Sequence, residues 1–244
     1  MQIRALRSQD DFAAAVALQR ATWGENFSEI VPPAILWAVQ NVGGIAAGAF
    51  DEHDALQGMV FGVSGVRNGE LAHWSDMLAV RPDARGAGIG IALKRFQRDA
   101  LITLGIRRAF WTFDPLEARN AHINFARLGV IAREYIRDAY GASDSVLHQG
   151  IGTDRLVAEW VLDSARVRAA LDGISAPADV ATEEVEIPGN IQRLKAADPA
   201  AARAWREKTR EQFDALLARG YVVLGFRRTE DAGHYLLGLP AFDS

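Results

Sequence analysis

A glycine-rich segment, Arg85-Gly86-Ala87-Gly88-Ile89-Gly90, holds the residues of this sequence best suited to chemistry. Three glycines at alternate positions are poor helix formers, but glycine lets the backbone adopt positive φ and approach a ligand closely. An amphipathic segment follows at once, so a helix N-terminus would direct free N–H groups and its positive dipole toward the loop. These features predict a pyrophosphate site, with Arg85 as a charged donor. The alternative is a strand-to-helix turn without a ligand.

Two common nucleotide-binding motifs are excluded at this loop. No Gly-Lys-Ser/Thr triplet follows it, as a Walker phosphate loop requires. The dinucleotide fingerprint needs glycine at position 91, which is isoleucine. Three basic residues of the following helix, Lys94, Arg95 and Arg98, are candidates for contact with a further phosphate.

The elements that position this loop can be read from periodicity and from helix stop signals. Helices are expected over 8–23, 33–42, 89–104 and 118–128, and strands over 3–7, 45–50, 56–66, 71–80, 108–114, 135–140 and 156–162. Asn68-Gly69 predicts an antiparallel hairpin between two of these strands. The helix after the loop connects strands 71–80 and 108–114 as a right-handed crossover, so those two strands should be parallel.

Composition changes beyond Ser164, which suggests a domain boundary. We therefore expect one domain over residues 1–163 and a second unit over 183–244 with strand–helix–strand–strand order. The helix of this unit begins at Asp198-Pro199 and ends before Gly220. This unit has no recognisable chemical motif, and it could complete an acceptor pocket, extend the sheet or form a homodimer interface.

The overall composition is that of an ordinary globular protein. The 244 residues are 49% hydrophobic and 24% charged, with a net charge of -4 and no cysteine. The charge gives no reason to expect a nucleic-acid or membrane partner, and the lack of cysteine excludes disulfides and thiolate metal sites. The histidines match no metal-ligand spacing, so no metal is expected. Without an apolar leader or a stretch of ~20 apolar residues, the expected compartment is cytoplasmic.

The loop and the element order together resemble the GNAT N-acyltransferase superfamily. Its signature, Arg/Gln-x-x-Gly-x-Gly/Ala, is matched by Arg85, Gly88 and Gly90, and the resemblance covers roughly residues 1–163. It implies an α/β (α+β) fold with a mixed, mostly antiparallel sheet and flanking helices. It also implies an enzyme that moves an acyl group from acetyl-CoA or another acyl-CoA to an amine.

The resemblance assigns parts of the cofactor to parts of the chain. The pyrophosphate is expected on Arg85, Gly86, Ala87, Gly88, Ile89 and Gly90, and the pantetheine arm along Met77, Leu78, Ala79 and Val80. Asn120, in the first turn of the next helix, is expected to touch the pantetheine, or else to cap that helix.

The catalytic acid of the family is missing. Many members have a tyrosine four residues before the glycine that ends the fourth helix, where this chain has Phe125 before Gly129. A phenyl ring donates no proton, so another hydroxyl or a water must do so, or the chain is a non-catalytic CoA-binding or regulatory module.

The candidate bases for the incoming ammonium are Asp76 and His73. Regular alternation puts Asp76 on one face of the strand with Leu78 and Val80, and His73 on the other, unless a bulge resets the phase. The alternative for Asp76 is a hydrogen bond to a neighbouring backbone N–H.

The acceptor is expected to be a small amine that carries a carboxylate, such as an amino acid. The segment from Trp111 to Asn120 resembles a subgroup of predicted acetyltransferases, some of which transfer succinyl groups to amino acids. Four arginines, Arg119, Arg127, Arg133 and Arg137, are candidates for a carboxylate clamp, although several of them must be solvated surface.

Overall fold

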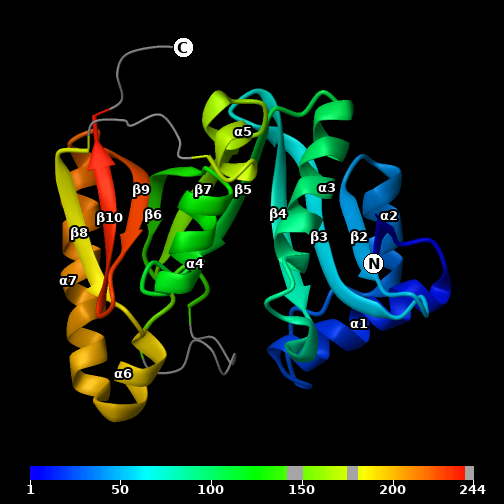
Figure 1. Cartoon of the computed structure of the whole chain (residues 1–244), viewed down its shortest axis with the longest axis horizontal. Helices are drawn as coiled ribbons and strands as arrows, with labels where there is room; N and C mark the ends of the chain where they lie inside the picture. Colours follow the sequence, from blue (N-terminus) through cyan, green and yellow to red (C-terminus); the bar gives the residue numbers. More distant parts are fainter. Residues whose placement is uncertain (142–150, 175–180, 240–244) are drawn as a thin grey trace. The chain divides into compact units, whose positions relative to one another are not determined.

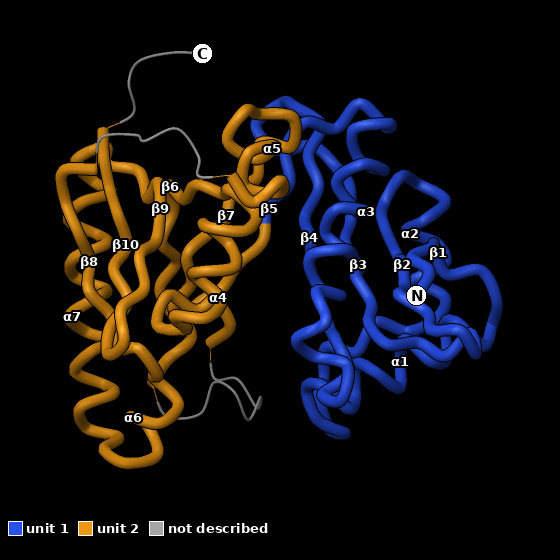
Figure 2. Tube along the Cα trace, in the orientation of Figure 1, with its two compact units in different colours: residues 1–110, 145–147 blue, residues 111–144, 148–244 orange. Residues whose placement is uncertain are grey.

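The structure is a computed structural model that describes residues 1–141, 151–174 and 181–239. The described chain divides into two compact units: described residues up to 110 belong to unit 1 and those from Trp111 onward to unit 2 (Figure 2). This division falls at a different place from the compositional boundary near residue 164, so the expected domains 1–163 and 183–244 stay a prediction.

Unit 1 contains a sheet with helices on both faces (Figure 1). Its helices are α1 (Gln9–Trp23), α2 (Pro33–Asn41) and α3 (Ile89–Thr103). Its strands are β1 (Gln2–Ala5), β2 (Ile45–Phe50), β3 (Leu56–Arg67), β4 (Glu70–Val80) and the start of β5 (Arg108–Phe113). The strand order is β1-β2-β3-β4-β5, antiparallel except for the parallel pair β4 and β5. The expected crossover is therefore confirmed.

Local sequence signals account for these elements. Ser8 and Asp11 form a reciprocal capping box at the start of α1, and Pro33 opens α2. Asn68 and Gly69 both have positive φ, 53° and 84°, as the tight turn between β3 and β4 requires.

The two sheet faces of unit 1 bury different partners. Phe12 and Leu18 of α1 and Leu36 of α2 share one core with Met77 and Ala79 of β4. On the other face α3 packs so closely that a Cβ at Gly58 of β3 would lie 3.0 Å from Ile89. The sheet is thus covered on both sides, and α3 is held in place directly behind the glycine loop.

Unit 2 continues β5 into a sheet of order β5-β7-β6-β9-β10-β8. Its strands are β6 (Ile131–Ile136), β7 (Arg155–Val161), β8 (Glu183–Pro188), β9 (Val222–Arg228) and β10 (Ala232–Gly238). Its helices are α4 (Ala118–His122), which continues as a π-helical turn over Ile123–Arg127, α5 (Ala165–Leu171), α6 (Ile191–Ala197) and α7 (Pro199–Ala218).

Three expectations for unit 2 need correction. The strand expected over 135–140 is β6, Ile131–Ile136, because the chain turns at Asp138, which has positive φ. No helix was expected just beyond Ser164, but α5 begins there, and the Ser164 side chain caps it by accepting from the backbone N–H of Val167. Helix α6 precedes α7, so two helices stand where the strand–helix–strand–strand pattern has one.

An aromatic cluster forms the centre of unit 2. The ring of Tyr235 in β10 packs edge-on against Phe125, Phe213 and Phe226, with centroid separations of 5.8, 5.2 and 4.8 Å. Its hydroxyl donates to the carbonyl of Pro115 at 2.6 Å. The C-terminal strands thereby share one core with the segment that follows β5.

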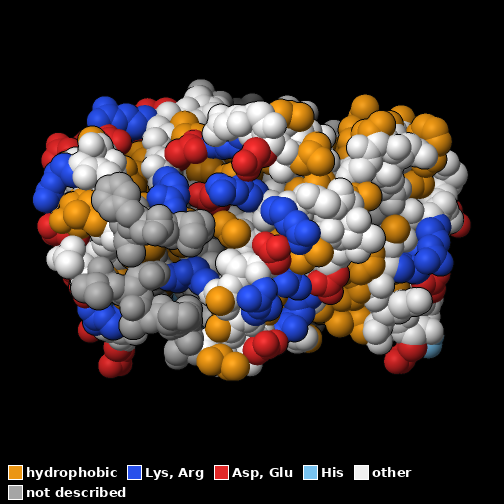
Figure 3. Space-filling view, turned by 90° about the horizontal axis from the view of Figure 1, so that it is seen from above, with side chains coloured by type: hydrophobic (Ala, Val, Ile, Leu, Met, Phe, Trp, Pro, Cys, Tyr) orange, Lys and Arg blue, Asp and Glu red, His pale blue; other side chains and the backbone are white. Residues whose placement is uncertain are grey.

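The surface carries both signs of charge. On the face in Figure 3, lysine and arginine side chains are interspersed with aspartate and glutamate, in keeping with the modest net charge of -4. Within the described ranges, no helix is both long enough and apolar enough to cross a bilayer.

Candidate functional site

The glycine loop connects β4 to α3 as an exposed turn. After Val80 the chain makes a short 3-10 helix, Pro82–Ala84, and then passes through Gly86 and Gly88 with φ of 93° and 76°. These left-handed conformations are disfavoured for any residue with a Cβ. Gly88 is the N-cap of α3 and has no side chain to cap the first turn. The first N–H groups of α3 therefore point to solvent without a side-chain acceptor.

The glycines leave room around this helix end. A Cβ added at Gly86 or Gly88 would meet no atom within 4 Å, and one at Gly90 would meet only Cδ2 of Leu78, at 3.8 Å. Packing within the protein does not require glycine at position 90, and Gly90 is not among the residues with positive φ. The free space lies directly over the first turn of α3, where an anion would interact with the N–H groups.

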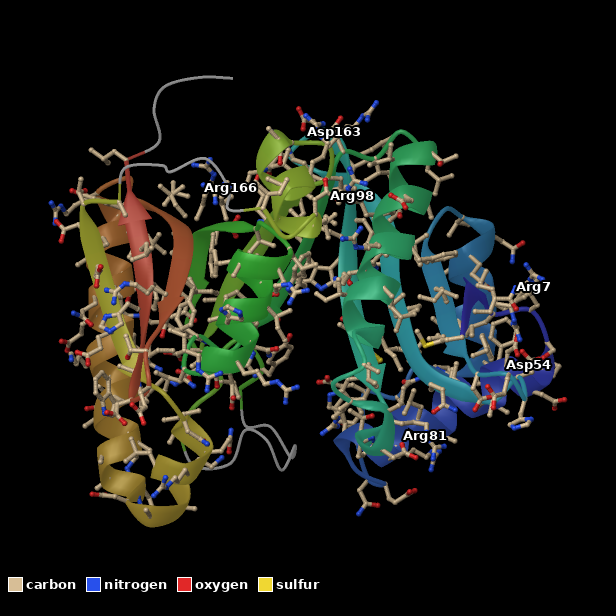
Figure 4. The ribbon with its side chains drawn as sticks, in the orientation of Figure 1. Arg7, Asp54, Arg81, Arg98, Asp163 and Arg166 are labelled. Carbon is tan, nitrogen blue, oxygen red and sulfur yellow. The ribbon has the colours of Figure 1, made fainter. Side chains whose placement is uncertain are left out.

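The charged groups near the loop differ from those expected. Arg85 is exposed and donates from Nε to the carbonyl of Val80 at 3.3 Å, and no acceptor for its Nη atoms occurs among the described residues. Arg98 lies well along α3 from Arg81, which stands near the loop, and it pairs with Asp99 (Figure 4). Lys94 is buried and hydrogen-bonded inside unit 1, so it is not a phosphate ligand. Arg85 and the exposed Arg95 are the remaining candidate donors.

Strand β4 has an unpaired edge beside the loop. It pairs with β3 over its whole length, but within the described residues it pairs with β5 only from Ala72 to Trp74. The backbone from Met77 to Val80 thus has hydrogen-bonding groups on the side away from β3 that no strand of unit 1 uses. An extended ligand with amide groups could add to this edge as a further strand.

A bulge in β4 resets its alternation at Asp76. Ser75 pairs with Gly62 and Met77 with Phe61, which leaves Asp76 without a partner in β3. His73 and Ser75 bond to α3, whereas Met77 and Ala79 pack against α1 and α2. The bulge is the exception under which regular alternation was not expected to hold, so the alternation of β4 is interrupted between Ser75 and Met77.

Asp76 is an exposed residue of β4. Crowding by surrounding atoms, and secondarily the negative charge of Glu29, raise its pKa above the usual carboxyl range. A carboxylate with a raised pKa beside an open strand edge is suited to accept a proton from an ammonium group.

His73 is the centre of a buried hydrogen-bond chain. Its Nδ1 lies 3.0 Å from Ser64 Oγ and its Nε2 lies 3.0 Å from Gln97 Nε2. Burial, and then the charge of Lys94, lower its pKa to about 3. Both ring nitrogens are engaged and the ring is neutral at pH 7, so the geometry favours Asp76 over His73 as the base.

Lys94 ends the same chain of hydrogen bonds. Its Nζ donates to Ser75 Oγ at 2.7 Å and to Gln97 Oε1 at 3.1 Å, and the residue is only 3% exposed. Burial lowers its pKa to about 7. These contacts connect the first turns of α3 to β4, and they hold the helix N-terminus at the end of that strand.

The lowered pKa of Lys94 makes stability depend on pH. Between pH 7 and about 10 the unfolded chain binds a proton at this lysine that the folded chain does not, so the free energy of unfolding rises with pH by up to about 1.4 kcal/mol per unit. We expect Lys94→Met to flatten this rise, measured by urea denaturation at several pH values. The exposed Arg95→Met variant is the control and should keep the slope. A wild-type curve parallel to that of Lys94→Met would contradict the assignment.

In unit 2, Asn120 and Phe125 occupy the positions expected from the sequence. Asn120 is exposed in α4, whose N-cap is Glu117, so Asn120 does not cap the helix. Phe125 is 4% exposed in the π-helical turn, and its ring packs edge-on against Phe113 and Tyr235. Tyr235 does not supply the missing acid, because its buried hydroxyl already donates to Pro115.

Phe125 packs as a core residue, which gives a direct prediction. We expect Phe125→Leu to lower the free energy of unfolding by about 1–2 kcal/mol, from lost aromatic contacts, with little change in turnover. Denaturation and steady-state kinetics on the same sample check both parts. A large fall in turnover without loss of folding would show a catalytic role for this ring.

Two of the four arginines considered for a carboxylate clamp are already paired with carboxylates of the chain. Arg133 pairs with Glu159 at 3.2 Å, and Arg137 Nε pairs with Asp214 at 2.8 Å. Arg119 and Arg127 are exposed side chains on the segment from 118 to 127. Glu159 of β7 and Asp214 of α7, both distant in sequence, therefore neutralise Arg133 and Arg137.

The sequence reading missed a different polar cluster, at the end of β5. Asp114 forms a turn, accepting from the backbone N–H of Leu116 at 2.8 Å, and it also binds Arg206 of α7 at 2.7 and 2.8 Å. Arg206 comes 92 residues later and lies among apolar residues of an amphipathic helix. No local pattern connects these two residues.

Comparison with known proteins bears on the fold. No protein-family model matches the sequence, and no curated protein matches it. Among solved structures, aminoglycoside 6'-acetyltransferase type Ii matches with a TM-score of 0.52 at 17% identity, over 67% of this chain and 99% of its own. An aminoglycoside 6'-N-acetyltransferase complexed with coenzyme A matches with a TM-score of 0.50 at 15% identity, over 67% of this chain and 98% of its own. A protein from Desulfovibrio desulfuricans, described as a GNAT-family acetyltransferase, matches with a TM-score of 0.51 at 15% identity, over 66% of this chain and 98% of its own.

These matches define the class of fold. The chain contains the fold of the GNAT acetyltransferases, which confirms the expected mixed, mostly antiparallel sheet with flanking helices. The matches span nearly all of each solved chain but about two thirds of this one. About a third of the chain is therefore additional to the part shared with these structures.

Proposed function

We propose that this chain is an acyl-CoA-dependent N-acyltransferase that transfers an acetyl or succinyl group from the CoA thioester to the primary amine of a small acceptor. The observation that carries this proposal is the open glycine turn between β4 and α3, set in a GNAT fold. An uncapped helix N-terminus with free space above it suits the CoA pyrophosphate. The coenzyme A bound to one structural neighbour supports the choice of ligand.

The cofactor would extend from the loop along the free edge of β4. Backbone N–H groups of residues 86–90 and the guanidinium of Arg85 would hold the pyrophosphate. The pantetheine amides would pair with the backbone from Met77 to Val80, whose outer edge has no strand partner in unit 1. A pantetheine contact of Asn120, an exposed residue of α4 in unit 2, stays a prediction from the family resemblance.

The reaction needs a base and a positioned thioester. The acceptor ammonium first loses a proton, for which we propose Asp76, because it is an exposed residue and its pKa is raised. The neutral amine then forms a bond to the acyl carbon, the C–S bond breaks as the CoA thiolate leaves, and the second proton lost by the nitrogen passes to that thiolate. Holding the two reactants together contributes most of the rate, so a water or a hydroxyl suffices to protonate the thiolate.

One assay separates this enzyme from its alternative, a non-catalytic CoA-binding or regulatory module. The purified chain is incubated with acetyl-CoA or succinyl-CoA and a panel of amines, and release of free thiol is followed with time. We expect amine-dependent thiol release for at least one pair and none without an amine. CoA binding in the absence of transfer to any amine would support the module instead.

A further inference from the structure

The bulge of β4 at Asp76 is fixed from both sides. Ser75 accepts a hydrogen bond from α3, whereas Met77 packs in the core formed with α1 and α2. In a regular strand residues 75 and 77 would point to the same face, so these two contacts require one extra residue between them. Asp76 is that residue, and on either side of it Ser75 and Met77 pair with Gly62 and Phe61 of β3.

The carboxylate of Asp76 is placed by the backbone alone. Among the described residues it has no hydrogen bond and no ion pair. A shift of the bulge by one residue toward the N-terminus would pair Asp76 with Gly62 and turn its side chain to the face of α3. Residues from Met77 onward would keep their register with β3. The place of this carboxylate therefore depends on which of two neighbouring residues forms the bulge.

A directional chain of hydrogen bonds ends at Ser75. Ser64 Oγ donates to the carbonyl of Gly43 at 2.7 Å, so it accepts from Nδ1 of His73. The other ring nitrogen, Nε2, is then an acceptor for the amide nitrogen of Gln97. This turns Oε1 of Gln97 toward Ser75, whose hydroxyl donates to it at 3.1 Å. Each donor has an acceptor in this chain, so the direction of the Ser75 hydroxyl is determined.

Lys94 makes the Ser75 hydroxyl costly to move. Its Nζ donates to Ser75 Oγ at 2.7 Å and to Gln97 Oε1 at 3.1 Å, and the residue is 3% exposed. A buried donor that loses an acceptor destabilises the fold, because no water replaces the lost bond. With the bulge at residue 75, Ser75 would turn away and the Asp76 carboxylate would face Lys94. The hydroxyl and the carboxylate thus compete for one buried amino group.

Gly62 adapts β3 to this arrangement. A Cβ there would lie 2.3 Å from Nε2 of His73 and 2.5 Å from the carbonyl oxygen of Trp74. Glycine is required beside the bulge because the ring of His73 occupies the space that a side chain would fill. Both strands are therefore shaped around the hydrogen-bond chain.

We propose that Ser75 is a positioning residue for Asp76: its hydroxyl, held by Lys94 and Gln97, keeps the bulge at residue 76 and the carboxylate away from the face of α3. The role of Asp76 as base rests on the proposed function, whereas the choice of register does not. Ser75 itself takes no part in proton transfer. Without its hydroxyl, the bulge moves to residue 75 and Asp76 pairs with Lys94, where its carboxylate is no longer available to an ammonium group.

The test is Ser75→Ala, followed by NMR and by kinetics. In the wild-type chain, cross-strand nuclear Overhauser contacts should connect the backbone of Gly62 to that of Ser75, and in the variant to that of Asp76. With an amine and an acyl-CoA that wild type uses, we expect kcat to fall about a hundredfold, a usual cost of misplacing a catalytic group. CoA affinity should not change, because Met77 to Val80 keep their register.

Ser64→Ala is the matched control, because it removes a hydroxyl from the other end of the same hydrogen-bond chain. We expect it to lower stability but to keep both the register and kcat. Two results would overturn the proposal: a wild-type register in Ser75→Ala, or equal falls of kcat in the two variants, which a merely structural role would give. If Ser75→Ala does not fold, Ser75→Cys replaces it, because a thiol is only a weak hydrogen-bond partner. A wild-type register in Ser75→Cys then rejects the proposal.

Register and transfer are measured separately, so this proposal and the proposed function fail separately. A register that moves in a chain with no acyl transfer to any amine would keep the control of Asp76 by Ser75 and reject the transferase. Acyl transfer by a Ser75→Ala variant with the wild-type register would keep the transferase and reject that control. A moved register with wild-type kcat would reject the positioning of a base by Ser75.

Discussion

Replacing Gly90 with glutamate is expected to weaken coenzyme A binding by at least about a hundredfold without destabilising the fold. Gly90 is the second residue of α3, and a Cβ there meets only Leu78, at 3.8 Å. A carboxylate in the first turn interacts favourably with the helix dipole, by about 0.3–1 kcal/mol, and the loss of glycine adds up to about 1 kcal/mol. The same carboxylate would stand where the pyrophosphate is proposed to bind, so it repels the ligand while it stabilises the helix.

The matched control for this prediction is Gly90→Gln, which adds nearly the same volume without the charge. We expect an intermediate loss of affinity from glutamine and the full loss only from glutamate. Calorimetric titration with CoA and urea denaturation of each variant provide the two measurements. A folded Gly90→Glu variant with unchanged CoA affinity would contradict a pyrophosphate site at this loop.

Replacing Asp76 with asparagine is expected to lower kcat/KM by about a hundredfold to ten-thousandfold, the usual contribution of a general base. Asparagine has nearly the same shape but accepts no proton at neutral pH, so CoA affinity and folding should change little. Steady-state kinetics with the best amine, together with CoA titration, check this. Retention of full activity in Asp76→Asn would exclude Asp76 as the base.

The pH profile provides an independent test of Asp76. Glu29 is a neighbouring negative charge that raises the pKa of Asp76, so Glu29→Gln should lower that pKa. The base is active when deprotonated, and the acidic limb of kcat/KM should therefore move to lower pH in Glu29→Gln. Glu25→Gln, an exposed change of equal charge nearby in the chain, is the control. An acidic limb in the same place for Glu29→Gln and wild type would mean that another group titrates.

The sequence by itself determined the elements around the glycine loop, because local rules govern them. The hairpin at Asn68-Gly69, the parallel crossover through α3 and the positive φ of Gly86 and Gly88 follow from turn chemistry and from helix periodicity. The capping of α1 by Ser8 is equally local. The turn was therefore predicted at the place where the structure has it, whereas the binding of a ligand there stays a prediction.

The tertiary structure alone decided which polar side chains are available for chemistry. Periodicity predicts that His73 lies in a strand and Lys94 in a helix. Only the packing of α3 on β4 buries the two side chains in one hydrogen-bond network. The bulge at Asp76 depends on the register between β4 and β3, which cannot be predicted from a short stretch of sequence. Arg133 and Arg137 are neutralised by residues far along the chain, and Arg206 meets Asp114 across 92 positions. Ion pairs form between whichever groups the fold brings together, so burial and the choice of partner are decided by long-range contacts.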